Sequence, residues 1–412
     1  MPRSLLLLVL SLALNLHTNS NAQDFDWVPR ASYPGTGRMG AFTFVLDGKG
    51  YVAGGYNGSS AVAELWCYDP LTDTWSQRAS LPSARRHGTS WTLNGRGYVV
   101  CGFGPTNQKT NTVLEYDPRT NTWATKTPLP ADARYGSHGF AIGQYGYVGG
   151  GNIGSATGPF LSDMWRYNSL SDTWSAIPGI PGAERYGATS WVIDGKGYVQ
   201  GGCLPSMSFT TQLWEFDPAD WSWTSKTPRP GDGLSYTMAM SFLYSAVVAC
   251  GKDDADYNNF QAFHYHPAAN QWTAIPNYPG ESGWGGASFT IGDRVFGGLG
   301  ARIIPQWQYF NDFWELVKID DVGVDEEFGN RSALRVHPSV CAEGGVHIFH
   351  EHGPQVGEAV VELVDASGRV LMRTPFVDGR YIDVSSLAAG TVAVRIVHEG
   401  RTMATGRFVV AR

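Results

Sequence analysis

A tryptophan recurs along this chain at a nearly constant interval, and this repeat limits the possible folds more than any other feature. The interval is 48, 48, 51, 49 and 49 residues between successive members of the series Trp27, Trp75, Trp123, Trp174, Trp223 and Trp272. A Gly-Gly or Cys-Gly pair recurs in phase with it, at residues 54–55, 101–102, 149–150, 201–202, 250–251 and 297–298. A fixed period of this length indicates a tandem array of similar structural units.

Each unit carries the pattern of short β-strands joined by turns. In the second unit, TSWTL is followed by an Asn94-Gly95 turn and by GYVVCG, and VLEYDP then enters a polar turn that ends on Trp123. Asp-Pro followed by Thr, Asn or Asp is typical of a type I turn, because Pro presets φ and Asp accepts backbone N–H groups. Four strands fit into each unit, and no helical period intervenes. Six such units predict an all-β, six-bladed propeller.

The repeat resembles the kelch family in three features: the Gly-Gly doublet after the second strand, the YDPLTDTW and YDPRTNTW turns, and the tryptophan that ends them. The resemblance covers residues 23–319 and implies a kelch-type β-propeller that holds its ligand on one face, often through arginines. Trp27 precedes the first Gly-Gly unit, whereas the sixth unit has no following tryptophan strand. We therefore expect the N-terminal strand to complete the last blade.

The N-terminal residues 1–22 have the pattern of a signal peptide. They contain one arginine, an apolar run from Leu5 to Leu14 and a small-x-small site that ends at Ala22. No later segment is long and apolar enough to be an integral membrane segment. The net charge of −7 offers no positive field for nucleic acid or an anionic membrane. We therefore expect an exported protein without a nucleic-acid partner.

The cysteines form no spacing that indicates a disulfide framework. The chain has 5 of them, an odd count for an exported protein. Buried free thiols are the main expectation. The alternative is one disulfide within the set Cys67, Cys101, Cys203 and Cys250.

The region after the propeller divides into an acidic linker at residues 320–332 and a strand-rich segment at residues 333–412. That segment resembles the C-terminal sorting domain of the bacteroidete type IX secretion system, through LRVHPSV, VELVDASGRVL and IDVSSLAAGTVAVRI. The resemblance implies a small Ig-like β-sandwich and the type IX secretion machinery as a partner. It also implies that the protein is secreted or held at the outer cell surface.

One face of the predicted propeller collects the long, variable loops. Up-and-down connectivity places the second-to-third-strand loops at the same end as the links between blades. Short turns such as DGKG and DPLTDT occupy the opposite end. The long loops are Tyr56–Ala63, Phe103–Thr112, Asn152–Ser162, Cys203–Thr211, Lys252–Asn259 and Leu299–Asn311. Loops positioned by a rigid scaffold commonly carry function, so we expect the ligand on this face.

Two sets of residues are candidates for ligand binding there. The first is a group of arginines in the links between blades, Arg38, Arg86, Arg134 and Arg185, whose guanidiniums could converge on a carboxylate or sulfate. The alternative is that each arginine bonds the backbone of an adjoining loop and joins two blades. The second set comprises aromatic residues, chiefly Tyr257, Trp284 and Trp307, with Tyr236 and Tyr309 beside them. Flat rings suit sugar faces and apolar side chains, whereas core packing is their alternative role.

The leading hypothesis is a non-enzymatic binding module for a glycan or a protein, with no catalytic residue, metal or cofactor. The first alternative is an enzyme that resembles the kelch-type sialic-acid mutarotases or epimerases, in which Glu184 or His138 would move a proton. The second is a copper oxidase resembling galactose oxidase, although that family has seven blades. No nucleophile elbow or phosphate loop is present in the sequence.

Overall fold

The computed structural model describes residues 25–242, 244–253 and 259–318, followed by shorter stretches between residues 334 and 410. These described residues form strands, turns and loops, and they contain no helix. No helix long and apolar enough to cross a membrane is therefore found among them. The expected signal peptide and the acidic linker lie outside the described residues.

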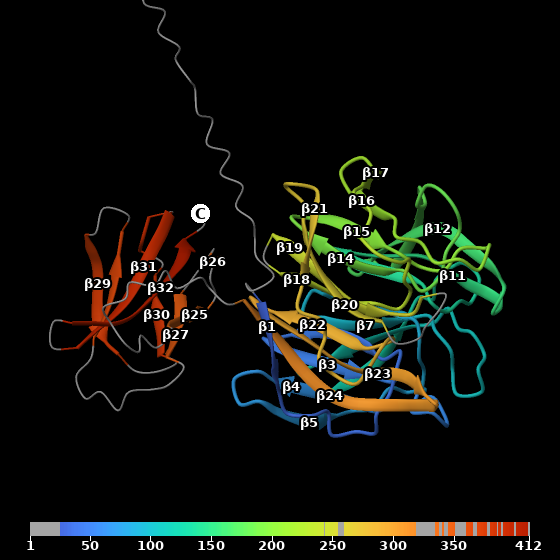
Figure 1. Cartoon of the computed structure of the whole chain (residues 1–412), viewed down its shortest axis with the longest axis horizontal. Helices are drawn as coiled ribbons and strands as arrows, with labels where there is room; N and C mark the ends of the chain where they lie inside the picture. Colours follow the sequence, from blue (N-terminus) through green and yellow to red (C-terminus); the bar gives the residue numbers. More distant parts are fainter. Residues whose placement is uncertain are drawn as a thin grey trace, which may run out of the picture.

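Six four-stranded antiparallel sheets make up the blades, arranged around a common centre (Figure 1). Blades 1 and 2 consist of β2 (Phe42–Leu46), β3 (Lys49–Ala53), β4 (Leu65–Asp69), β5 (Thr74–Arg78), β6 (Thr89–Leu93), β7 (Arg96–Val100), β8 (Val113–Asp117) and β9 (Thr122–Lys126). Blades 3 and 4 consist of β10 (His138–Ile142), β11 (Tyr145–Ser155), β12 (Gly158–Asn168), β13 (Thr173–Ile177), β14 (Thr189–Ile193), β15 (Lys196–Gln200), β16 (Leu213–Asp217) and β17 (Ser222–Lys226). Blades 5 and 6 consist of β18 (Met238–Phe242), β19 (Ser245–Gly251), β20 (Asn259–His266), β21 (Gln271–Ile275), β22 (Ala287–Ile291), β23 (Arg294–Ile304), β24 (Gln306–Lys318) and β1 (Phe25–Pro29).

The N-terminal strand closes the ring, which confirms the prediction made from Trp27. The sixth sheet has the order β1-β24-β23-β22, and Trp27 pairs with Leu316 of β24. A buried carboxylate, Glu315, locks this junction: it accepts hydrogen bonds from Arg30 Nε at 2.7 Å and from Arg294 Nε at 2.7 Å. The chain thereby joins its first and last blade-forming strands through both backbone pairing and an ion-pair cluster.

The repeated tryptophan fastens each blade to the link that precedes it. The indole N–H of Trp75 donates to Ala31 O at 2.8 Å, and that of Trp123 donates to Ala79 O at 2.8 Å. The backbone N–H of Ala31 in turn donates to Asp73 Oδ1 at 2.9 Å, so one link residue is held by both members of the turn. The motif YDPLTDTW recurs because every blade needs this fastening.

A glycine in the second strand allows neighbouring blades to approach closely. A Cβ on Gly97 would lie 2.4 Å from the ring of Phe44 in the preceding blade, and one on Gly197 would lie 2.3 Å from the ring of Phe140. Aromatic rings from the inner strands therefore fill the space between blades directly over a bare backbone. This packing explains why Gly-Tyr follows the first turn of so many units.

Two of the expected long loops are extended hairpins instead. β11 and β12 continue to Ser155 and from Gly158, and β23 and β24 are separated by one residue. Register shifts after Gly149 and Gly298 let these hairpins bend away from the blade and still remain paired. Segments expected to be irregular thus extend the sheet because their backbone groups pair with each other.

The described residues of the C-terminal region form two sheets. They are ordered β25-β27-β30 and β26-β32-β31-β28-β29. Their strands are β25 (Leu334–His337), β26 (Val340–Cys341), β27 (Gly345–His350), β28 (Val360–Val364), β29 (Val370–Pro375), β30 (Arg380–Asp383), β31 (Gly390–His398) and β32 (Arg401–Val410). Buried Ile382 of the first sheet packs in one core with Leu363 and Val394 of the second. The Ig-like class and the sorting role stay predictions.

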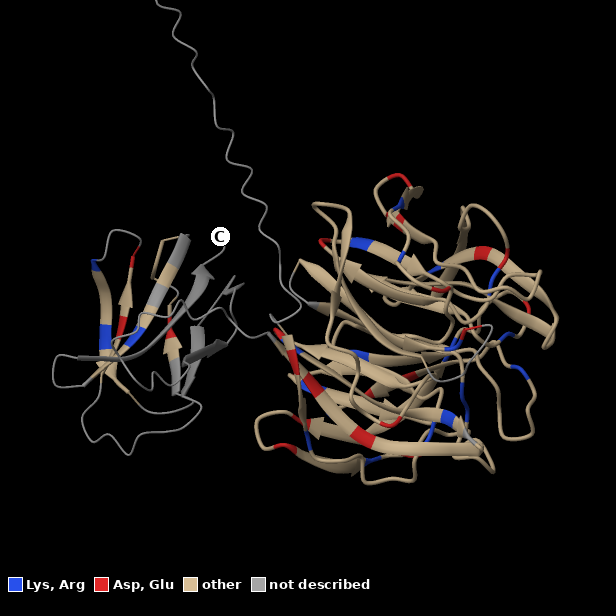
Figure 2. Cartoon of the chain, viewed as in Figure 1, with Lys and Arg blue, Asp and Glu red and all other residues tan. Residues whose placement is uncertain are grey.

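Charged residues are sparse on the blades. Figure 2 shows that long stretches of strand carry no charge and that acidic and basic residues are interspersed where charges occur. Only 16% of the residues in the chain are charged, below the usual quarter. Any charge-based recognition by the propeller therefore depends on a few positioned side chains.

Candidate functional site

A closed ring of backbone hydrogen bonds surrounds the central channel. Each link between blades contributes one residue, whose N–H donates to the carbonyl of its counterpart in the preceding blade. The members of this inner ring are Gly40, His87, Gly136, Gly187, Tyr236 and Gly285, and the N···O distances run from 2.6 to 3.0 Å. All of them have positive φ, between 52° and 67°. The left-handed backbone turns each chain toward its neighbour and thereby closes the ring.

We expect Gly40→Ala to lower the free energy of unfolding by about 2–4 kcal/mol, because it combines left-handed strain with a clash. The new Cβ would lie 2.4 Å from His87 Cδ2. Gly48→Ala is the matched control: its φ is also positive, at 71°, but its Cβ would meet nothing within 4 Å. That variant should lose about 1 kcal/mol. Urea denaturation measures both, and equal losses would show that the ring geometry adds nothing.

Two inner-ring positions carry side chains where the other positions have glycine. His87 and Tyr236 hold φ values of 55° and 52°, a conformation that costs non-glycine residues about 1–3 kcal/mol. Their rings lie 5.1 Å apart, and Trp284 stacks parallel to His87 at 6.3 Å. Burial, followed by the charge of Arg86, lowers the pKa of His87 to about 3, so its imidazole is neutral at pH 7. Burial also raises the pKa of Tyr236 well above its usual value.

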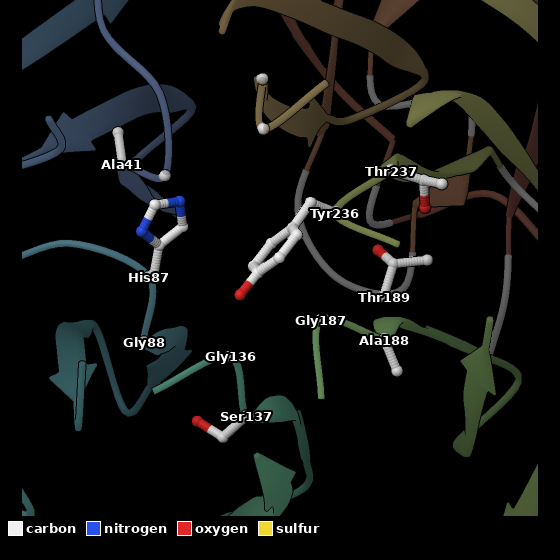
Figure 3. A pocket seen from close by; sticks show the side chains of 13 residues that line it. Ala41, His87, Gly88, Gly136, Ser137, Gly187, Ala188, Thr189, Tyr236 and Thr237 are labelled. Atoms are coloured by element: carbon white, nitrogen blue, oxygen red, sulfur yellow. The ribbon is translucent and has the colours of Figure 1, made fainter. Parts of the chain in front are cut away.

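A pocket of about 110 Å³ lies at this ring. Its wall is formed by the inner-ring residues and by the residues that follow them. Figure 3 shows the rings of His87 and Tyr236 pointing into the pocket from different blades, with Ser137, Thr189 and Thr237 around them. No Asp, Glu, Lys or Arg belongs to the wall. The pocket is therefore small, polar and formally neutral.

Three of the four candidate arginines are fixed inside the blades. Arg38, Arg134 and Arg185 are at most 1% exposed, and each donates through Nη1 to a carbonyl of the small-residue pair that follows, at 3.1, 3.2 and 3.4 Å respectively. Arg134 also makes two bonds to Asp163, at 2.6 and 2.9 Å. The expected convergence of four guanidiniums is therefore not found, because these three satisfy backbone and side-chain acceptors within their own blades.

The fourth candidate, Arg86, occupies a different register. In the second blade the structural counterpart of Arg38 is Arg85, which is 4% exposed and donates to Thr112. Arg86 is the next residue, so it takes the position held by Tyr135, Tyr186 and Trp284 in other blades. The Arg85-Arg86 doublet was the sequence feature that could have separated the two roles. Its second arginine, Arg86, takes a position on the long-loop face that three other blades fill with an aromatic residue.

Arg86 is held in place by aromatic rings and neutral groups. Its guanidinium carbon lies 4.4 Å from the ring centre of Tyr56 and 4.9 Å from that of Phe103, and Nη2 donates to Asn107 Oδ1 at 2.8 Å. Burial lowers its pKa, and nearby tyrosines, led by Tyr56 and Tyr236, oppose that shift. Among the described residues, no carboxylate forms an ion pair with Arg86. Its positive charge is thus positioned but not compensated by those residues.

The candidate aromatic residues have unequal positions. Trp284 is only 7% exposed, whereas Trp307 is 43% exposed and meets it edge-on at 5.6 Å. Trp307 is also near Tyr309, which in turn contacts Tyr56 at 5.8 Å. These contacts connect the exposed indole to the ring stacked on Arg86. Tyr257 lies outside the described residues.

The residues considered for catalysis are not brought together. His138 is 2% exposed at the start of β10, and burial, with Arg185 next, lowers its pKa to about 3. Glu184 is exposed in the link between β13 and β14. Within the described part of the chain, no group of three or more His, Cys, Asp or Glu is placed to hold a metal. Cys67, Cys101, Cys203 and Cys250 are buried and form no disulfide with one another, in agreement with the main expectation.

Sequence reasoning missed the immediate partners of Arg86. Tyr56, Phe103 and Asn107 come from two different loops, and Tyr135 comes from a third link. Tyr56 and Phe103 share one repeat position, directly after the small-residue pair, but blades 3 and 4 have Asn152 and Cys203 there. Asn107 and Tyr135 occupy other positions, so periodicity could not group the four residues. Only their assembly around one guanidinium distinguishes them from ordinary loop residues.

Comparison with known proteins agrees with the fold. Residues 37–82 match the model of the kelch motif. Kelch-like protein 35 of Mus musculus is 28% identical over 193 residues, which are 47% of this chain and 32% of that protein. Kelch-like protein 23 of Homo sapiens is 27% identical over 259 residues, which are 61% of this chain and 44% of that protein. The matched region thus spans less than half the length of these relatives.

A solved structure is similar in fold at lower sequence identity. The structure titled "Structure of YjhT" superposes with a TM-score of 0.61 at 17% identity, over 71% of this chain and 98% of that one. At this identity the likeness concerns the fold alone. The six four-stranded blades, the kelch motif at residues 37–82 and the kelch relatives together support a kelch-repeat protein.

Proposed function

We propose that the propeller is a binding module that takes a carboxylate of a protein or glycan partner at Arg86 on the long-loop face. One observation carries this proposal: Arg86 is positioned by Tyr56, Phe103 and Asn107, and no described carboxylate pairs with it. A half-buried guanidinium without a counter-ion favours an anionic ligand, and its planar donors suit a carboxylate.

The surroundings of Arg86 favour a partner with apolar or flat groups beside its carboxylate. Tyr56 and Tyr309 contact each other, and exposed Trp307 extends the aromatic surface from Tyr309. Aromatic side chains and arginine are typical of the residues that dominate protein interfaces. The kelch fold supports a role in protein interaction. A glycan with a carboxylate would use the same groups, because sugar faces stack on aromatic rings.

We propose further that the protein acts outside the cell. The apolar run after Arg3 and the small residues before residue 23 support export, and the C-terminal motifs support passage through the type IX machinery. An exported kelch propeller would then present its long-loop face to a partner in the medium or on another cell surface.

Replacement of Arg86 by Gln should weaken ligand binding about 10- to 100-fold, the loss expected for a charge-assisted hydrogen bond worth about 1.5–3 kcal/mol. A peptide and glycan array on the full mature chain identifies the ligand, and calorimetry measures both proteins. Arg119→Gln is the control, because Arg119 lies in a turn of the opposite face and its side chain is 72% exposed. Equal affinity of both variants for the array ligand would place the binding site elsewhere.

One observation favours the mutarotase-like alternative. The neutral imidazole of His87 lies beside Arg86, with 3.2 Å between His87 Nδ1 and Arg86 Nη1, so a proton-transfer group would lie near a bound carboxylate. Sialic acid has such a carboxylate. NMR observation of its anomers after mutarotation is started distinguishes the functions: an enzyme shortens the approach to equilibrium, whereas a binding module leaves that rate unchanged.

A further inference from the structure

The channel pocket contains a histidine whose tautomer can be assigned. Arg86 Nη1 lies 3.2 Å from His87 Nδ1, and a guanidinium can only donate, so Nδ1 accepts and Nε2 carries the proton. His87 is 7% exposed, and its Nε2 makes no hydrogen bond to another described residue. A buried N–H donor therefore belongs to the wall of the pocket without an acceptor from the described chain.

Two buried hydroxyl groups in the same wall also lack a hydrogen-bond partner among the described residues. Ser137 and Thr237 are 6% and 8% exposed, and neither Ser137 Oγ nor Thr237 Oγ1 has a hydrogen-bond partner among the described residues. Hydroxyl groups deeper in the channel differ: Ser241 Oγ, for example, donates to Val192 O at 2.8 Å. Unsatisfied hydroxyls thus concentrate at the pocket, where burying them without a partner costs about 1–3 kcal/mol each.

Backbone N–H groups add further donors to the pocket. The N–H of Thr43 donates to Ser90 Oγ of the next blade, and that of Gly139 donates to Ser190 Oγ. Alternate residues of a strand direct their N–H groups to the same side. Ala41 and Ser137 lie two residues earlier, immediately before these strands, and both line the pocket, so an extended backbone there would direct their N–H groups to the same side. Opposite them the next blades offer Gly88 and Ala188, which have no hydroxyl to accept the bond.

We propose that this pocket is a binding site for a small monovalent anion of the size of chloride or formate. The donors come from His87, Ser137, Thr237 and the adjoining backbone, and no carboxylate competes with the anion. Arg86, which forms no ion pair with a carboxylate among the described residues, adds positive charge through its contact with His87. Neutral donors fixed in a buried site stabilise an anion without the cost of burying a second formal charge.

The size and backbone of the pocket agree with this ligand. A volume of about 110 Å³ holds an ion and several waters. The strained residues His87 and Tyr236 stand at inner-ring positions where glycine would fit without strain. An anion that accepts a hydrogen bond from Nε2–H explains why a histidine stands at this strained position.

Anomalous diffraction from bromide-soaked crystals of the full chain tests the site directly, with a peak expected within hydrogen-bond distance of His87 Nε2. In solution, the chloride NMR linewidth measures affinity. The double variant Ser137→Ala, Thr237→Val should bind chloride about tenfold more weakly or worse, as expected for the loss of two donors. Ser241→Ala is the matched control, because its hydroxyl belongs to the same channel but is already bonded.

Two outcomes would overturn the proposal. One is the absence of bromide from the pocket of the unmodified protein, which would mean that water alone satisfies these groups. The other is an equal chloride linewidth in the double variant and in the control. If the double variant fails to fold, the bromide experiment on the unmodified chain still decides. Ligand binding at Arg86 is measured separately in the double variant, which retains that side chain.

Discussion

Replacement of Glu315 by glutamine is expected to lower the free energy of unfolding by about 3–5 kcal/mol, because removing one charge of a buried cluster leaves the others uncompensated. Glu315 is 1% exposed and accepts bonds from Arg30 and from both Nε and Nη2 of Arg294, each at 2.7 Å. The three residues join the link after β1 to the third and second strands of blade 6. The loss therefore falls on the junction that closes the propeller, and urea denaturation measures it.

The same carboxylate should make stability depend on acid. Burial alone would raise the pKa of Glu315, but the hydrogen bond and charge of Arg294, followed by those of Arg30, outweigh burial and lower that pKa. A lowered folded-state pKa means that the stabilisation is fully present above the unfolded value of about 4.3. It is lost as pH falls through the folded pKa. As pH falls below about 4, the stabilities of the unmodified protein and Glu315→Gln should therefore begin to converge.

Glu215→Gln is the matched control for both measurements. Glu215 faces Tyr198 in blade 4 in the same register in which Glu315 faces Phe296 in blade 6. Its ion-pair partners are Lys196 and Lys226 near the surface, and the hydroxyl of Tyr198 can donate to a glutamine as it does to Glu215. The expected loss is therefore about 1 kcal/mol. If both variants lose the same amount, or if the deficit of Glu315→Gln does not shrink as pH falls below about 4, closure does not depend on this ion-pair cluster.

Replacement of Arg134 by methionine is expected to lower the free energy of unfolding by about 3 kcal/mol or more, because buried acceptors lose their donor. Arg134 Nε donates to Asp132 O at 3.1 Å, and the guanidinium binds Gly150 O and Asp163. Methionine fills much of the same volume but donates nothing. Thermal denaturation followed by circular dichroism measures the change.

Two comparisons separate a structural role of Arg134 from a ligand-binding role. Arg134→Lys keeps the charge but cannot reproduce the fork of donors, so it should lose most of the same stability. Arg119→Met removes an exposed arginine and should change stability by less than about 0.5 kcal/mol. A stable Arg134→Met protein that no longer binds the array ligand would assign Arg134 to the binding site and contradict its structural role.

The sequence predicted the repeating part of this molecule because each repeat has the same local chemistry. The tryptophan of YDPLTDTW donates to a link carbonyl in every described blade where it occurs, and the glycine before each second-strand tyrosine admits a neighbouring ring. Such contacts recur at fixed sequence separations. The number of blades and the closing strand that begins at Phe25 were therefore accessible from spacing alone.

The candidate site was less predictable because it depends on departures from the repeat. Arg86 was grouped with Arg38 and Arg134 by its place before a glycine-containing link, although Arg85 is their structural counterpart. A shift of one residue reverses the direction of a side chain on an extended link. For this reason the guanidinium of Arg85 is bonded inside its blade, whereas that of Arg86 lies on the long-loop face.

The sequence by itself determined the all-β repeat, the blade count, the closing strand and the face with the longer connections, because these follow from periodic turns and strand alternation. Only the tertiary structure decided which arginine is available and which groups surround it. It also revealed the ring of backbone bonds and the unsatisfied donors of the pocket. Those features arise where single residues of different blades meet around one axis. The positions of the backbone ring follow the repeat, but the side chains that replace glycine at two of them, and the groups that surround those side chains, do not.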